Sequence, residues 1–87
     1  MSNAPLQGIY IDGTFDRLIT KQRKDNQGQE YKAYFVGMVV RTEESTHIYQ
    51  LRTKSPETYA KMEQGMPLRV RVWPRVYKDN IYYNISE

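Results

Sequence analysis

Strict alternation of apolar and polar residues over residues 67–73 is the feature that most constrains this chain. A period of two is typical of a β-strand, because successive side chains point to opposite faces of a sheet. One face carries Leu68, Val70 and Val72, and the other carries Arg69, Arg71 and Trp73. The alternation therefore predicts a strand over residues 67–76 with one apolar face and one basic, aromatic face. Pro74 predicts that the end of this strand lies at a sheet edge or a bulge.

Four further segments are rich in β-branched and aromatic residues and are bounded by turn-forming residues, which favours strands. They are residues 9–20, 31–41, 47–53 and 81–86. Gly13 is expected to mark a bulge or bend in the first segment, and Gly37 a kink in the second. Polar connections are predicted at residues 21–30 and 42–46, and a hairpin tip at residues 77–80, with Asp79 and Asn80 as its turn residues.

A short helix is predicted between the third and fourth strands. Ser55-Pro56-Glu57 combines a capping residue, a proline at the first helical position and an acid in the first turn. Residues 56–64 are long enough for two turns with Tyr59 and Met62 on one face, and Gly65 is suited to end them.

The order of three strands, a short helix and two strands predicts an all-β, five-stranded OB-fold barrel. An SH3-like barrel is the alternative. Residues 1–8 are small and polar and are interpreted as a flexible tail, so residues 9–87 form the single domain. A chain of 87 residues without cysteine has a thin core and no disulfide to support it, which favours a homodimer.

The basic residues are segregated from the acidic ones. The formal net charge is only +3, but two clusters contain no acid. They consist of Arg17, Lys21, Arg23 and Lys24 in the first part of the chain, and Arg69, Arg71, Arg75 and Lys78 near its end. Such clustering indicates a polyanionic partner.

Tyrosine is unusually frequent, with eight residues against two phenylalanines and one tryptophan. A tyrosine ring suits a surface that is dry on one side and wet on the other, as binding faces are. We predict that nucleotide bases stack on the rings of Tyr31, Trp73 and Tyr77. The residues of both basic clusters are predicted to contact phosphates. The choice between Tyr34 and Phe35, and between Tyr82 and Tyr83, as the buried member of each pair stays open.

Each of these features also has a plainer interpretation. The basic face of the fourth strand is then an ordinary solvated face with Trp73 filling a bend, and the loop at residues 21–24 only keeps the chain soluble.

Catalysis finds little support in the sequence. His47 is the single histidine, and no serine or cysteine motif accompanies it. Glu43 and Glu44 lie in a predicted turn, and Asp12 and Asp16 lack a third ligand. Since no glycine-rich phosphate loop is present either, we expect no enzyme activity, no metal, no cofactor and no small-molecule substrate.

The layout of residues 9–86 resembles the single-stranded DNA-binding proteins of filamentous phages, the gene V or helix-destabilising family. The resemblance lies in the total length, the stretch Gln27-Gly28-Gln29-Glu30-Tyr31 and the late hairpin. It implies a dimeric OB fold that coats single-stranded DNA during phage or plasmid replication. It also implies base stacking by Tyr31, phosphate contacts by Lys21 and Arg23, and an aromatic residue, Tyr77, near the tip of the late hairpin.

The leading hypothesis is therefore a sequence-independent single-stranded DNA-binding protein. One alternative is an SH3-like or OB-type interaction module that binds a peptide on its aromatic surface. Another is an RNA-binding OB domain, which differs only in the ribose hydroxyl that it meets. No apolar run approaches the ~20 residues of a membrane span, and no signal peptide is recognisable, so we expect a cytoplasmic protein without membrane contact.

Overall fold

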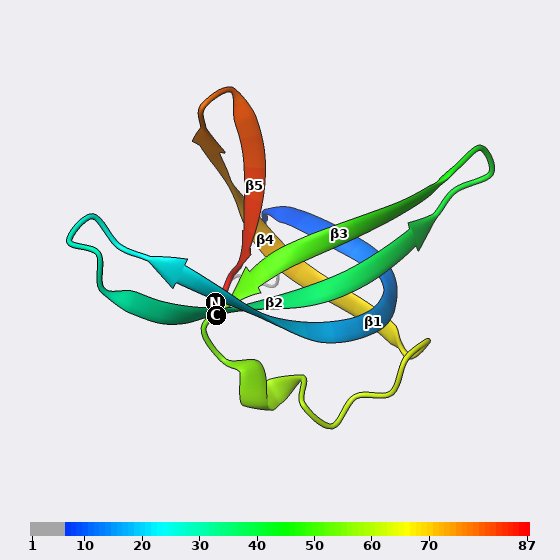
Figure 1. The fold of residues 1–87 in the computed structure, drawn as a ribbon. Helices are drawn as coiled ribbons and strands as arrows, with labels where there is room; N and C mark the ends of the chain where they lie inside the picture. Colours follow the sequence, from blue (N-terminus) through cyan, green and yellow to red (C-terminus); the bar gives the residue numbers. More distant parts are fainter. Residues whose placement is uncertain (1–6) are drawn as a thin grey trace, which may run out of the picture.

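Five β-strands and one 3-10 turn make up the fold, a computed structural model that describes residues 7–87 (Figure 1). The strands are β1 (Ile9–Lys24), β2 (Glu30–Arg41), β3 (Thr46–Thr53), β4 (Pro67–Tyr77) and β5 (Asn80–Ile85). The 3-10 turn η1 (Pro56–Thr58) lies between β3 and β4. Of the predicted tail over residues 1–8, residues 1–6 lie outside the described part of the chain.

The strands close into a barrel in the order β1-β2-β3-β5-β4, with β4 pairing back onto β1. The neighbours are antiparallel except β3 and β5, which are parallel and pair at Arg52 and Asn84. The predicted OB-fold barrel, with one short helical element between the third and fourth strands, is confirmed.

The long strand β1 serves two neighbours in turn. Its residues 9–14 pair with β4 and its residues 14–24 pair with β2, with a register shift between Phe15 and Arg17. Gly13 lies just before this changeover, and a Cβ atom there would collide with the backbone oxygen of Val39. Glycine therefore lets β1 and β2 approach closely where β1 bends, as the sequence predicted.

The polar connection after the first strand is shorter than predicted. β1 continues to Lys24 and β2 begins at Glu30, so Lys21–Lys24 belong to a strand and not to a loop. Cross-strand pairing explains the extension: Arg23 faces Tyr31 and Lys24 faces Glu30. Opposite charges and a cation beside a ring stabilise antiparallel pairs of low intrinsic β-propensity.

The core fills the barrel from alternate positions of the strands. Its buried side chains are Phe15, Val36, Met38, Leu51, Tyr59, Val70, Val72 and Ile85. The predicted apolar face of the fourth strand thus packs inward at Val70 and Val72, and its basic face points outward. Tyr59 belongs to this core, and burial, with a smaller effect from the charge of Glu87, raises the pKa of its hydroxyl.

The predicted two-turn helix over residues 56–64 is a single 3-10 turn, η1, and Ser55 makes no side-chain capping hydrogen bond. Tyr59 and Met62 nevertheless pack against the core, as expected. The end of the segment is tied to β1 instead of continuing a helix. The Gly65 amide donates to the Phe15 oxygen, and the Phe15 amide donates to the Met66 oxygen, both at 2.8 Å. A helix of this length is not stable without strong capping.

The tip of the β4–β5 hairpin lies where it was predicted, but its turn residues are Lys78 and Asp79 rather than Asp79 and Asn80. Both have positive φ angles, 49° and 65°, which is the geometry of a type I′ turn. Asparagine and glycine favour these positions, because other residues experience strain there.

Replacing Asp79 by glycine should therefore stabilise the protein. We expect the free energy of unfolding to rise by roughly 0.5–1 kcal/mol, since glycine relieves the strain at φ 65°. Urea unfolding measures the change. Asp79→Ala is the matched control, because it removes the same carboxylate and keeps the strain. A lower midpoint for Asp79→Gly than for Asp79→Ala would contradict the turn geometry.

Candidate nucleic-acid interface

An open groove of about 550 Å³ lies between the β1–β2 hairpin and the β4–β5 hairpin. The residues that line it come from all five strands and from the β1–β2 loop. We call it the basic groove; its lining residues are Arg23, Lys24, Asn26, Tyr31, Phe35, Gln50, Arg52, Arg75, Val76, Tyr77, Tyr82, Tyr83 and Asn84.

Strand register explains how β2 and β3 present side chains to this groove. Val36 and Leu51 face each other across the two strands and are fully buried in the core. Their sequence neighbours Phe35 and Arg52, which also face each other, therefore point outward. The inward alternation that builds the core thus places a ring and a guanidinium side by side on the outer face.

Cations lie over aromatic rings at several places along the groove. Arg52 is centred 6.0 Å from the Tyr31 ring, and Arg75 lies 6.0 Å from the Tyr82 ring. The Phe35 ring has two cations near it, Lys21 at 5.0 Å and Arg23 at 5.8 Å. Each pairing holds a charge and a flat apolar surface in one place.

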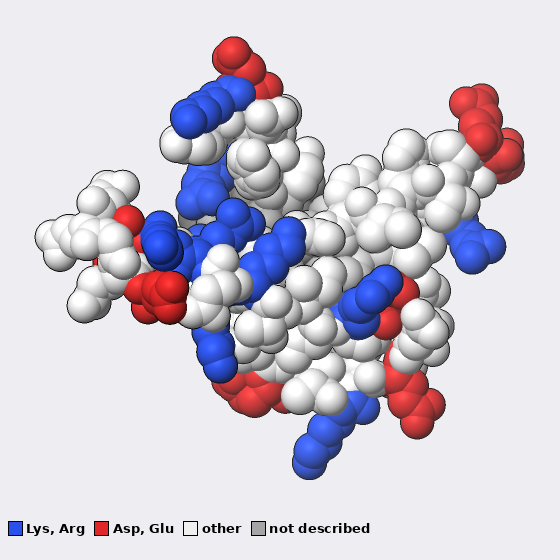
Figure 2. All heavy atoms as spheres, viewed as in Figure 1, with Lys and Arg blue, Asp and Glu red and all other residues white. Residues whose placement is uncertain are grey.

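The charge along the basic groove has one sign, since none of its lining residues is acidic. Figure 2 shows lysine and arginine side chains gathered between the two hairpins that flank it, with acidic side chains on the outer parts of these hairpins and at the far tip of the β2–β3 hairpin. Lys21 is fixed beside the groove by a 2.6 Å hydrogen bond that its Nζ donates to Gln50 Oε1. The groove therefore offers fixed positive charge to an extended anion.

The structure brings together many of the predicted contact residues. Those that line the basic groove are Arg23, Lys24, Tyr31, Arg75 and Tyr77. Lys21 lies beside it over Phe35, and Lys78 lies over the Tyr77 ring at 5.4 Å. Both predicted basic clusters thus contribute to one surface, although they are far apart in the chain.

Four predicted residues lie outside the groove: Arg17, Arg69, Arg71 and Trp73. Arg17 forms a salt bridge with Asp16 at 3.1 Å. A hydrogen bond from Gln64, and to a smaller extent one from Arg17, lowers the pKa of the Asp16 carboxyl. Arg69 lies 3.5 Å from Asp12.

Trp73 and Arg71 line a separate hollow of about 200 Å³ beside Ile9. β4 pairs with β1 only as far as Val72, and its residues 73–77 pair with β5. Pro74 therefore lies where β4 has no β1 partner among the described residues, in agreement with the predicted edge position. Trp73 is 61% exposed, so it is not core filler, and it is not among the residues that line the groove.

Sequence reasoning missed several groove residues, namely Asn26, Gln50, Arg52, Val76 and Asn84, and left Phe35, Tyr82 and Tyr83 undecided. Phe35 and Tyr82 face the groove, and Tyr83 is half-buried with its ring 6.4 Å from Tyr49. Alternation around Leu51 could have predicted the outward position of Arg52, because the neighbour of a buried leucine in a strand points to the opposite face.

Comparison of the chain with protein families, curated proteins and solved structures found no match. The resemblance to the filamentous-phage proteins therefore stays a prediction. Within residues 7–87, no group of three His, Cys, Asp or Glu side chains is arranged to hold a metal ion. No helix in this part of the chain has the length and apolar character needed to cross a membrane. The fold and the groove together define the class of protein: it is an OB-type barrel with a basic, aromatic groove on its surface.

Proposed function

We propose that this protein binds single-stranded DNA in the basic groove without sequence preference and without catalysing a reaction. One observation carries the proposal: the groove combines cation–ring pairs from several strands, and no acid lines it. Single-stranded nucleic acid offers the complementary features, a row of phosphates and a row of unpaired bases.

Binding would begin with charge. The four cations that line the groove, Arg23, Lys24, Arg52 and Arg75, attract phosphates and displace condensed counterions. Bases would then stack on the rings of Tyr31, Phe35 and Tyr82. Every base has a flat face, so stacking tolerates all sequences.

Assembly into a homodimer, and a role in coating DNA during phage or plasmid replication, are further parts of the proposal. They rest on the family resemblance and on two exposed apolar side chains of the β4–β5 hairpin. Val76, which also borders the basic groove, and Ile81 face each other across this hairpin and are 69% and 60% exposed. A paired apolar surface of this kind is suited to a second copy of the chain. Sedimentation equilibrium tests the dimer, and a monomer at every concentration would contradict it.

The binding proposal is tested by titrating a labelled thymine oligomer with the protein at several salt concentrations. Four neutralised phosphates predict a slope of about −3 in log K against log salt, or roughly a 50-fold loss of affinity between 50 and 200 mM. Adenine and cytosine oligomers should bind within a few-fold of thymine. An affinity that does not change with salt would contradict the proposal and favour a peptide-binding module. Tighter binding of a matched RNA oligomer would instead make RNA the ligand.

A further inference from the structure

A second hollow, of about 500 Å³, lies next to the basic groove at the gap between β3 and β5. We call it the β3–β5 pocket. It shares Arg52, Arg75 and Asn84 with the groove, so the two are continuous across these side chains. Its other lining residues are Lys32, Ala33, Tyr34, Thr53, Lys54 and Ile85.

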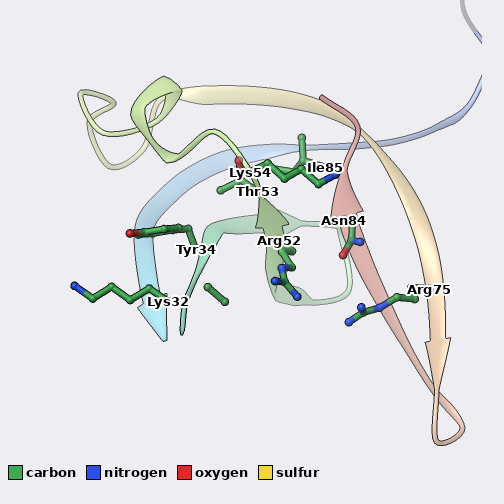
Figure 3. A pocket seen from close by; sticks show the side chains of 9 residues that line it. Lys32, Tyr34, Arg52, Thr53, Lys54, Arg75, Asn84 and Ile85 are labelled. Atoms are coloured by element: carbon green, nitrogen blue, oxygen red, sulfur yellow. The ribbon is translucent and has the colours of Figure 1, made fainter. Parts of the chain in front are cut away.

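The gap exists because β3 and β5 pair at a single position, Arg52 with Asn84. In Figure 3, Arg52 extends from the end of β3 into the middle of the pocket, and Asn84 and Arg75 face it from β5 and β4. Lys32 and Tyr34 extend from β2 in the opposite direction. The side chains that face the middle of the pocket are therefore two guanidinium groups and an amide.

A further cation, in addition to Arg52, Arg75 and Lys32, stands at the other edge of the pocket. Lys54 lines the pocket but not the basic groove. Its backbone amide donates to Glu87 Oε1 at 2.7 Å, and the Thr53 hydroxyl donates to both oxygens of the same carboxylate, at 2.8 and 2.9 Å. Glu87 thus fixes the end of β3, where Arg52 lies, and Lys54, which directly follows the strand.

The chemistry of the pocket suits a phosphate better than a base. Arg52, Lys54, Arg75 and Asn84 supply donors and positive charge, and the Tyr34 ring extends away from the centre. Guanidinium groups match the geometry of phosphate oxygens, whereas a base would need a ring on which to stack.

We propose that the β3–β5 pocket holds one further backbone phosphate of the bound strand, with Lys54 as the cation that belongs to it alone and the groove residues Arg52 and Arg75 facing it from the shared wall. The bound DNA strand then leaves the basic groove past Arg52 and runs over the gap between β3 and β5, which pair only at Arg52 and Asn84. This inference rests on the proposed function and deepens it, because it assigns a path to the backbone beyond the groove.

Lys54 provides the test, because it is exposed and belongs to the pocket alone. In the full chain, Lys54→Gln should lower the slope of log K against log salt by about 0.7 for a thymine oligomer, the share of one phosphate. Lys54→Arg keeps the charge and should keep the slope. The matched control is Lys61→Gln, an exposed lysine of the segment before β4 that lines neither the groove nor the pocket.

The outcomes separate this inference from the function on which it depends. An unchanged slope in Lys54→Gln, together with a lower slope in the groove variant Arg23→Gln, would overturn the pocket assignment and leave the groove in place. Failure of the unaltered protein to bind any oligomer would overturn both proposals. Equal losses in Lys54→Gln and Lys61→Gln would also contradict the pocket, since they would indicate only the effect of net charge.

Discussion

Replacing Tyr31 by alanine is expected to weaken the binding of single-stranded DNA by roughly 5- to 150-fold, because stacking contributes about 1–3 kcal/mol per base. Tyr31 lies on the outer face of β2 within the basic groove, and the guanidinium of Arg52 lies 6.0 Å from its ring. The ring is partly exposed, so its removal leaves the core intact. Anisotropy of a labelled thymine oligomer measures the loss, and urea unfolding shows whether stability is unchanged.

Trp73→Ala is the matched control for this experiment. It removes a larger aromatic ring that is more exposed than Tyr31 but lies in the hollow beside Ile9. Its affinity should stay within about twofold of the unaltered protein, since a surface change away from the site alters little. A greater loss in Trp73→Ala than in Tyr31→Ala would move the site to the outer face of β4, where the sequence alone placed it.

Replacing Arg52 by alanine is expected to lower affinity about tenfold and to reduce the salt slope by at least about 0.7. Arg52 lines both the basic groove and the β3–β5 pocket, and it also lies beside the Tyr31 ring. Its loss therefore removes a phosphate contact and the cation next to a stacking surface. Arg52→Lys should recover the salt slope but not the full affinity, because an ammonium lacks the planar guanidinium.

Arg41→Ala is the control for charge, because Arg41 ends β2 near the acidic tip of the β2–β3 hairpin and lines neither hollow. It lowers the net charge by the same amount as Arg52→Ala. If both variants lost affinity equally, binding would depend on net charge alone and the groove would have no special role.

The sequence predicted the fold well because each signal was local. Alternation around Val70 and Val72 fixed both faces of the fourth strand, and turn residues separated the strands. The errors arose where partners distant in the chain decide the structure. Lys21–Lys24 became strand through pairing with β2, and the helix after Ser55 was cut short by backbone bonds between residues 65–66 and Phe15.

The candidate site was harder to predict, because alternation gives the face of a strand but not its place on a closed barrel. Trp73 and Arg75 share the outer face of β4, yet only Arg75 reaches the basic groove. β4 pairs with β1 only as far as Val72, opposite Ile9, so Trp73 lies next to that end of β1, whereas Arg75 lies opposite the groove residue Tyr82 of β5. Arg52 was not predicted as a contact residue, because it belongs to neither basic cluster of the sequence. Closure of the barrel places it in the same groove as Arg75.

Amide chemical-shift mapping during a titration with a thymine oligomer tests the location of the site most directly. We predict that the largest shifts fall on β2 and β3 near Tyr31 and Arg52 and on the β4–β5 hairpin near Arg75 and Tyr82, with the Trp73 indole signal unchanged. Shifts centred on Trp73 and Arg71, with the groove residues unaffected, would contradict the account.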